Sequence, residues 1–156
     1  MVPSAYNNNV QLVQTHDYVT IVNEMIHSAR IVDLTGRPHA PQAIRYLTGD
    51  SVGHWEGDTL VVDTTNFLKD AAFRGASANM HLIERFTRVD ENTLRYEFTV
   101  DDPATWTKKW TASIPMVRTN ERMFEYSCHE ANYALEGVLK GARFQDKQTP
   151  PSPKHP

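Results

Sequence analysis

A glutamate within an apolar stretch is the residue of this chain best suited to acid–base chemistry. Glu84 lies between Leu82 and Phe86, and the alternation of side chains along a strand places all three on one face. Burial in an apolar interior raises the pKa of a carboxyl group toward neutrality, which makes it usable as a general acid or base. Two other interpretations stay open. They are exposure on the other face, or a structural ion pair with Arg85, Arg88 or Arg95.

Histidines are the expected partners of this glutamate. His129 and Glu130 follow the last expected strand, and the ends of strands form the mouth of a β-barrel, where binding sites commonly lie. His27 shares a strand face with Ile21 and so is also expected inside. The alternative for the pair at 129–130 is a polar turn that leads into a helix, with a side chain such as Glu130 as its cap.

Metal and cofactor chemistry have no sequence support. The histidines show neither His-x-His nor His-Glu-x-x-His spacing, so a metal site would have to be assembled from distant strands. The chain also lacks a Gly-x-Ser-x-Gly nucleophile turn and a glycine-rich phosphate loop before a helix. We therefore predict a site without metal or cofactor.

The residues expected to hold a substrate are basic and aromatic. Lys108 falls on the inward face of an expected strand, and Arg37 in a turn has the fork geometry that binds carboxylates. Either would stabilise an anion. The expected pocket wall consists of Trp106, Trp110, Tyr96 and Phe98, with Glu130 at the mouth.

Turn signals along the chain predict the strands that position these residues. Short polar clusters such as Glu56-Gly57-Asp58 separate runs rich in β-branched and aromatic residues, which is typical of hairpins. The expected strands cover residues 18–27, 29–34, 51–55, 59–67, 81–89, 93–100, 106–118 and 123–129. A meander of this length tends to roll up because closure removes exposed edges. The predicted fold is all-β and mainly antiparallel, a lipocalin-like meander barrel or a strongly curled sheet.

The C-terminal part of the chain has a different pattern. Apolar residues at 135, 138, 139 and 142 predict a short helix over residues 134–144, although Gly137 and Gly141 weaken it. Residues 145–156 are polar and carry four prolines, which favours a disordered tail. We therefore expect one barrel-like domain over residues 1–144, followed by this tail.

Composition narrows the classes of partner. The formal charge of -3, from 16 basic and 19 acidic residues, argues against nucleic-acid binding, which normally needs a basic face. No stretch approaches the roughly 18 apolar residues of a membrane-spanning helix. A small-molecule ligand or substrate is the expected partner, and a homodimer is compatible with the sequence. The lone cysteine, Cys128, predicts no disulfide within the chain.

Several segments together resemble a family of bacterial proteins common in soil bacteria, for which no activity is established. They are Tyr6-Asn7-Asn8-Asn9, Gly36-Arg37-Pro38-His39, the run from Gly53 to Val62, the run from Glu84 to Asp90, Asp101-Asp102-Pro103 with Trp106 and Trp110, and the run from Glu125 to Glu130. Members typically look exported and carry an upstream segment with a cysteine. The resemblance implies a periplasmic or extracellular location, a missing native N-terminal part and a lost disulfide partner for Cys128.

Three functions are compatible with this pattern. The first is an enzyme that performs general acid–base chemistry without a cofactor, as a lyase, isomerase or hydrolase, on a small organic or sugar-like substrate, with Glu84 as acid or base and His129 or His27 as its partner. The second is a non-catalytic, lipocalin-like carrier of an apolar ligand. The third is a structural or interaction module. Several convergent titratable groups in the pocket would favour the enzyme, and an aliphatic cavity would favour the carrier.

Overall fold

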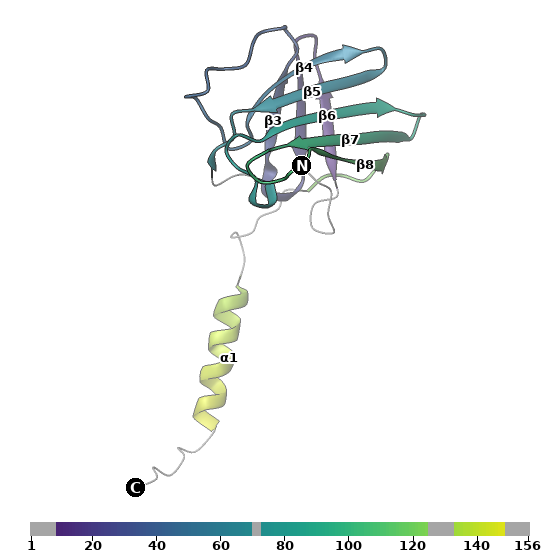
Figure 1. The fold of residues 1–156 in the computed structure, drawn as a ribbon. Helices are drawn as coiled ribbons and strands as arrows, with labels where there is room; N and C mark the ends of the chain where they lie inside the picture. Colours follow the sequence, from purple (N-terminus) through teal and green to yellow (C-terminus); the bar gives the residue numbers. More distant parts are fainter. Residues whose placement is uncertain (1–8, 70–72, 125–132, 149–156) are drawn as a thin grey trace. The chain divides into compact units, whose positions relative to one another are not determined.

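A computed structural model describes residues 9–69, 73–124 and 133–148 of the chain (Figure 1). It divides into a sheet unit that ends at Phe124 and a C-terminal unit that begins at residue 125. The elements are β1 (Val10–Gln14), β2 (Tyr18–Asn23), the 3-10 turn η1 (Met25–His27), β3 (Ala29–Asp33), β4 (Asp50–Glu56), β5 (Thr59–Thr65), the 3-10 turn η3 (Phe73–Gly75), β6 (His81–Arg88), β7 (Thr93–Asp101), β8 (Trp110–Val117) and α1 (Ala134–Gln148).

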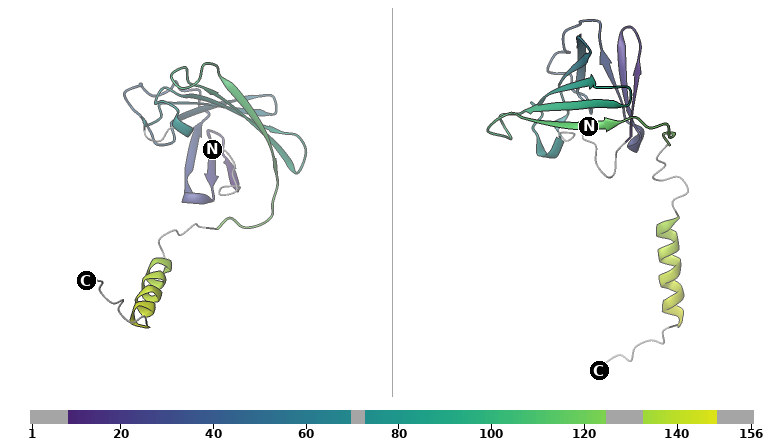
Figure 2. Two further views of the ribbon diagram at one scale, coloured as in Figure 1. Left: turned by 60° about the horizontal axis from the view of Figure 1, so that its bottom comes forward. Right: turned by 90° about the vertical axis from the view of Figure 1, so that its right-hand side faces the viewer.

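The eight strands form one strongly curled sheet in the order β1 to β8 (Figures 1 and 2). Neighbouring strands are antiparallel except β3 and β4, which run parallel through only two register pairs, Val32 with Ser51 and Asp33 with Val52. The prediction of a mainly antiparallel, strongly curled sheet with a short C-terminal helix is confirmed. The sheet is a half-barrel, in which β1 and β8 are not hydrogen-bonded to each other.

The parallel pair requires a crossover, because two parallel strands cannot be joined by a tight turn. Residues 34–49 make this connection, hereafter the crossover. Arg45 of the crossover donates to the backbone oxygens of Phe67 and Ala78, and the Tyr46 backbone pairs with Phe67 in an isolated bridge. The C-terminal part of the crossover is therefore bound to the segments between β5 and β6.

Buried side chains gather on the interior face of the sheet. The alternation predicted for β6 and β7 is confirmed, since Leu82 and Phe86 of β6 and Tyr96, Phe98 and Val100 of β7 are all buried. The same core cluster takes in Val19, Ile21, Val32, Leu60, Val62, Phe67, Ala76 and Met80. The interior face is thus made by the strands on both sides of the β3–β4 junction.

Several predicted boundaries are wrong. The strand expected over residues 18–27 ends at Asn23, because the chain turns into η1, where Ile26 has a positive φ of 65°. The strand expected from residue 106 begins only at Trp110, after the turn that follows Asp102. β1 was not predicted at all. Of the strand expected over residues 123–129, Met123 and Phe124 are not in a strand, and the rest lies outside the described residues.

The C-terminal helix is longer than its prediction. It continues to Gln148, four residues past the expected end at 144, so residues 145–148 are helical rather than part of a disordered tail. None of the helical residues is buried. Residues 149–156 of the predicted tail lie outside the described part of the chain.

Glycine is required at position 49, at the end of the crossover, because of the backbone conformation and because there is no room for a side chain. Its φ is +75°, and an added Cβ would lie 2.8 Å from the backbone oxygen of Thr65. We expect Gly49→Ala to lower the free energy of unfolding by about 2–4 kcal/mol, from the left-handed conformation and from overpacking. Urea denaturation measures this loss.

Gly36→Ala is the matched control, because Gly36 has a φ of +80° but nothing within 4 Å of the added Cβ. Its expected cost is the conformational part alone, about 1–2 kcal/mol. Equal losses in the two variants would show that the close packing against Thr65 does not matter.

Candidate functional site

An ion pair lies in the interior of the sheet unit. Arg30 of β3 is 5% exposed and Glu84 of β6 is fully buried. The Nη1 atom of Arg30 lies 2.5 Å from Oε2 of Glu84, and Nη2 donates to Oε1 at 2.8 Å. Both carboxylate oxygens therefore lie close to the terminal nitrogens of the guanidinium.

Polar neighbours surround this pair. The hydroxyl of Tyr96 donates to Oε1 of Glu84 at 2.8 Å, and Nη1 of Arg30 donates to Oγ1 of Thr64 at 3.3 Å. Oγ1 of Thr64 in turn lies 2.9 Å from the hydroxyl of Ser51. Hydrogen bonds of this kind offset the cost of taking two charges out of water.

The electrostatics contradict the expectation that burial raises the pKa of Glu84 toward neutrality. Burial alone would raise the pKa of Glu84, but the charge of Arg30 and the hydrogen bonds from Arg30 and Tyr96 outweigh it and hold that pKa below its usual value. Burial, followed by the charge of Glu84, raises the pKa of Tyr96 far above its ordinary value. Glu84 is therefore a carboxylate and Tyr96 a neutral phenol, so neither is poised to exchange a proton near neutral pH.

Glu84 does form a structural ion pair, but the three partners predicted for it are wrong. Arg85 pairs with Glu56, Arg95 lies near Glu97, and Arg88 donates to backbone oxygens of the β6–β7 turn. Arg30 takes their place. The sequence indicated Arg30 only through its position two residues before Val32, which places both on the inward face of β3.

A cavity of about 220 Å³ lies beside the ion pair, and we call it the Arg30 pocket. Its wall comes from β3, the crossover, η3 and the segments that flank it, and β6 and β7. The lining residues are Arg30, Leu47, Thr48, Phe67, Phe73, Met80, Leu82, Tyr96, Phe98 and Val100. Most of them are apolar, and four carry aromatic rings. A concave apolar site with few polar groups is typical of small-molecule sites.

Glu84 does not line this pocket. It borders instead a separate void of about 10 Å³ together with Asn23, Arg30 and Tyr96. That volume is about the size of one water molecule. The ion pair therefore presents its guanidinium side, and not its carboxylate, to the larger cavity.

Only some of the predicted site residues line the Arg30 pocket. Tyr96 and Phe98 line the pocket as expected. Trp106 and Trp110 are half-buried and are not part of its wall, but Trp110 packs edge-on against Phe98 with ring centroids 5.6 Å apart.

The expected basic groups lie elsewhere. Lys108 is exposed, because it precedes β8 and has no inward strand face. Arg37 belongs to an ion cluster described below. His129, Glu130 and the side chain of His27 lie outside the described residues.

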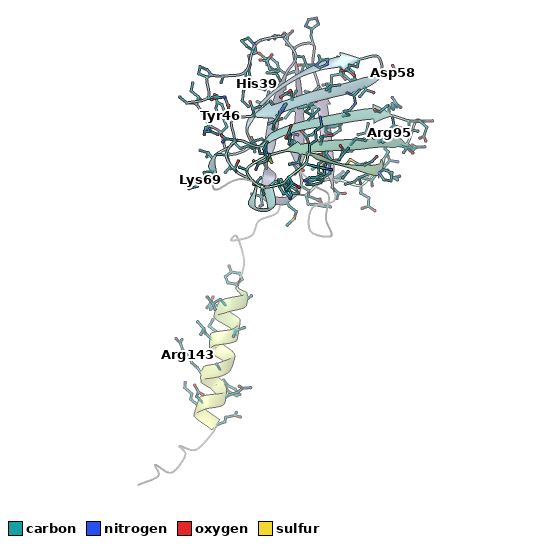
Figure 3. All side chains as sticks on the ribbon, viewed as in Figure 1. His39, Tyr46, Asp58, Lys69, Arg95 and Arg143 are labelled. Atoms are coloured by element: carbon teal, nitrogen blue, oxygen red, sulfur yellow. The ribbon has the colours of Figure 1, made fainter. Side chains whose placement is uncertain are left out.

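An ion cluster binds the crossover to the outer side of the sheet. Arg37 pairs with Asp33 and Asp50, and His39 lies between Asp50 at 3.1 Å and Asp63 at 3.0 Å. Figure 3 shows His39 and Tyr46 at one end of the sheet, with Asp58 and Arg95 toward the other. Because Arg37 is occupied by two carboxylates, it is not a free anion site.

The charges of this cluster shift the pKa values of its members. Hydrogen bonds from Arg37 hold the pKa of Asp50 far below its ordinary value, and the same bonds raise the pKa of Arg37. The hydrogen bond from Nε2 of His81 to Asp63, at 2.8 Å, raises the pKa of His81. The cluster is thus a set of mutually satisfied charges that fastens the crossover, and sequence analysis had not connected its members.

Comparisons of the chain with protein-family models, with curated proteins and with solved structures found no match. Within residues 9–69, 73–124 and 133–148, no group of three or more histidine, cysteine or acidic side chains is arranged to hold a metal ion. No helix in that same part of the chain is long and apolar enough to cross a membrane. The resemblance stated above therefore stays a prediction, and the site is interpreted from its own geometry.

Proposed function

We propose that this chain binds a small, largely apolar organic molecule in the Arg30 pocket. The observation that carries the proposal is the cavity itself, about 220 Å³ in volume and walled by Phe67, Phe73, Met80 and Phe98. An engineered cavity of about 150 Å³ holds one benzene ring, so this one suits a ligand of about ten non-hydrogen atoms.

Binding is favoured over acid–base catalysis by the arrangement of the titratable groups. Glu84 is held as a carboxylate by Arg30 and Tyr96 and does not border the pocket. A general acid or base must reach the reacting atom within hydrogen-bond distance. The described residues of the pocket wall therefore support a carrier better than a cofactor-free enzyme.

The proposal predicts stabilisation by suitable ligands. Acetophenone, which has an aromatic ring and no charge, should raise the midpoint of thermal unfolding in a concentration-dependent way. A ligand at 100 times its dissociation constant adds about 2.7 kcal/mol to the free energy of unfolding. Thr48→Phe places a ring where Thr48 lines the cavity, and we expect it to weaken binding at least about tenfold.

Ile44→Phe is the matched control, because Ile44 lies in the same crossover but is about half exposed and does not line the pocket. This variant should bind as the unmodified chain does. Calorimetric titration gives the dissociation constants directly. Absence of binding to the unmodified chain, or equal binding by the Thr48→Phe variant, would contradict the proposed site.

A further inference from the structure

The Arg30 pocket contains a cation that is not available to a ligand. Arg30 is the one charged residue among the described residues that line the cavity. An unpaired guanidinium in such a place would bind a carboxylate or phosphate group strongly, because arginine matches the geometry of those anions. The pocket would then select acids.

Glu84, which does not line the cavity, already pairs with this cation. Its two oxygens lie 2.5 and 2.8 Å from the two terminal nitrogens of Arg30. Tyr96 holds the same carboxylate in place through its hydroxyl. The charge of Arg30 is thus balanced within the protein, by a group that is fully buried and outside the cavity.

A second anion in the pocket would therefore lack a counter-ion. It would lose its hydration on entry and would lie near the negative charge of Glu84, which makes its burial unfavourable. An uncharged ligand avoids both the loss of ionic hydration and the repulsion by Glu84. The rings of Phe67, Phe73 and Phe98 favour contact with another aromatic ring.

We propose that Glu84 is a specificity-determining residue, which neutralises Arg30 and thereby restricts the pocket to uncharged aromatic molecules. This inference rests on the proposed function, since it names the class of ligand for the same cavity. It also gives a role to a carboxylate that is too strongly paired to serve as an acid or base.

Acetophenone, benzamide and benzoate test the inference, because they have the same number of non-hydrogen atoms and differ in charge. Dissociation constants come from titrations followed by amide chemical shifts at pH 7. We expect the unmodified chain to bind acetophenone and benzamide at least about tenfold more tightly than benzoate, since an unpaired buried charge is costly. Benzoate binding as tight as that of benzamide would overturn the inference. Failure of all three to bind would instead refute the proposed function.

Glu84→Gln is the decisive variant, because the amide keeps the shape of the side chain and removes its charge. Arg30 then lacks its counter-ion, and we expect the preference to invert, with benzoate binding more tightly than benzamide. Continued rejection of benzoate by a folded Glu84→Gln protein would remove Glu84 from specificity.

A double variant keeps the test conclusive if Glu84→Gln does not fold. Arg30→Met with Glu84→Met removes both charges and keeps the neutral hydroxyls of Tyr96, Thr64 and Ser51. If Glu84 fully masks Arg30, the ratio of benzamide to benzoate affinity should change less than about threefold, because no net charge has been removed. A fall in relative benzoate affinity of tenfold or more would show that Arg30 attracts anions despite Glu84, which would overturn the inference.

Discussion

Replacing Arg30 with methionine is expected to lower the free energy of unfolding by about 3–5 kcal/mol, the usual cost of breaking a buried ion pair. The replacement leaves Glu84 fully buried with its carboxylate facing an apolar side chain. The measurement is urea denaturation at pH 7. The folded pKa of Glu84 lies below its unfolded value, so its contribution is present at this pH and is lost as the pH falls.

The double replacement of Arg30 and Glu84 by methionine serves as the control. Removing both charges leaves no uncompensated charge, although the Tyr96 hydroxyl loses its carboxylate acceptor, so we expect the double variant to be more stable than the single one. A double-mutant cycle then yields the coupling between the two residues. A loss below about 1 kcal/mol in the Arg30→Met variant, or additive losses in the double variant, would mean that the pair contributes little.

Truncation of Phe98 is expected to have the second large effect, a loss of about 3–5 kcal/mol for Phe98→Ala. Its ring is 4% exposed, stacks on Tyr96 with centroids 5.5 Å apart and meets Trp110 edge-on. Removal of the ring leaves a cavity among aromatic neighbours and enlarges the Arg30 pocket.

Phe124→Ala gives the comparison for the same chemical change at the surface. Phe124 is 70% exposed, so its truncation should alter stability by no more than about 0.5 kcal/mol. Chemical denaturation of the two variants measures the loss in the free energy of unfolding at each position. Similar losses at both positions would show that Phe98 does not support the core.

The fold was predictable where turns and alternation agree. Asp90-Glu91-Asn92 marks the hairpin between β6 and β7, and the alternation in β7 correctly placed Tyr96 and Phe98 inside. Each signal depends only on residues close in sequence, so one strand and its turn suffice to read it.

Boundaries failed where a backbone conformation, and not hydrophobicity, ends the strand. Met25 continues the alternation of Val19 and Ile21 past the end of β2. Ile26 nevertheless adopts a positive φ, which is uncommon for a β-branched residue. Trp106 has the aromatic character of a strand residue, but its amide bonds to the carbonyl of Asp102 and closes a turn. β1 was missed because its five residues are mostly exposed.

One member of the buried ion pair was predictable from the sequence, and its partner was not. The apolar flanks of Glu84 correctly placed its side chain inside, but its partner is 54 positions away in sequence. Periodicity sorts side chains into faces and cannot decide which members of two distant strands meet. The prediction therefore chose nearby arginines, and it assigned Lys108 to a strand that begins only at Trp110.

The short parallel junction between β3 and β4 makes the ion pair a link between two parts of the sheet. β1 to β3 form one leaf of the sheet and β4 to β8 another, joined by two register pairs and by the crossover. Arg30 belongs to the first leaf, whereas Glu84, Tyr96 and Phe98 belong to the second. The pair thus connects the two leaves across the junction that has the fewest register pairs in the sheet. Arg30 is the part of the pocket wall that the first leaf contributes, so the pair also holds that residue in place beside the rings of the second leaf.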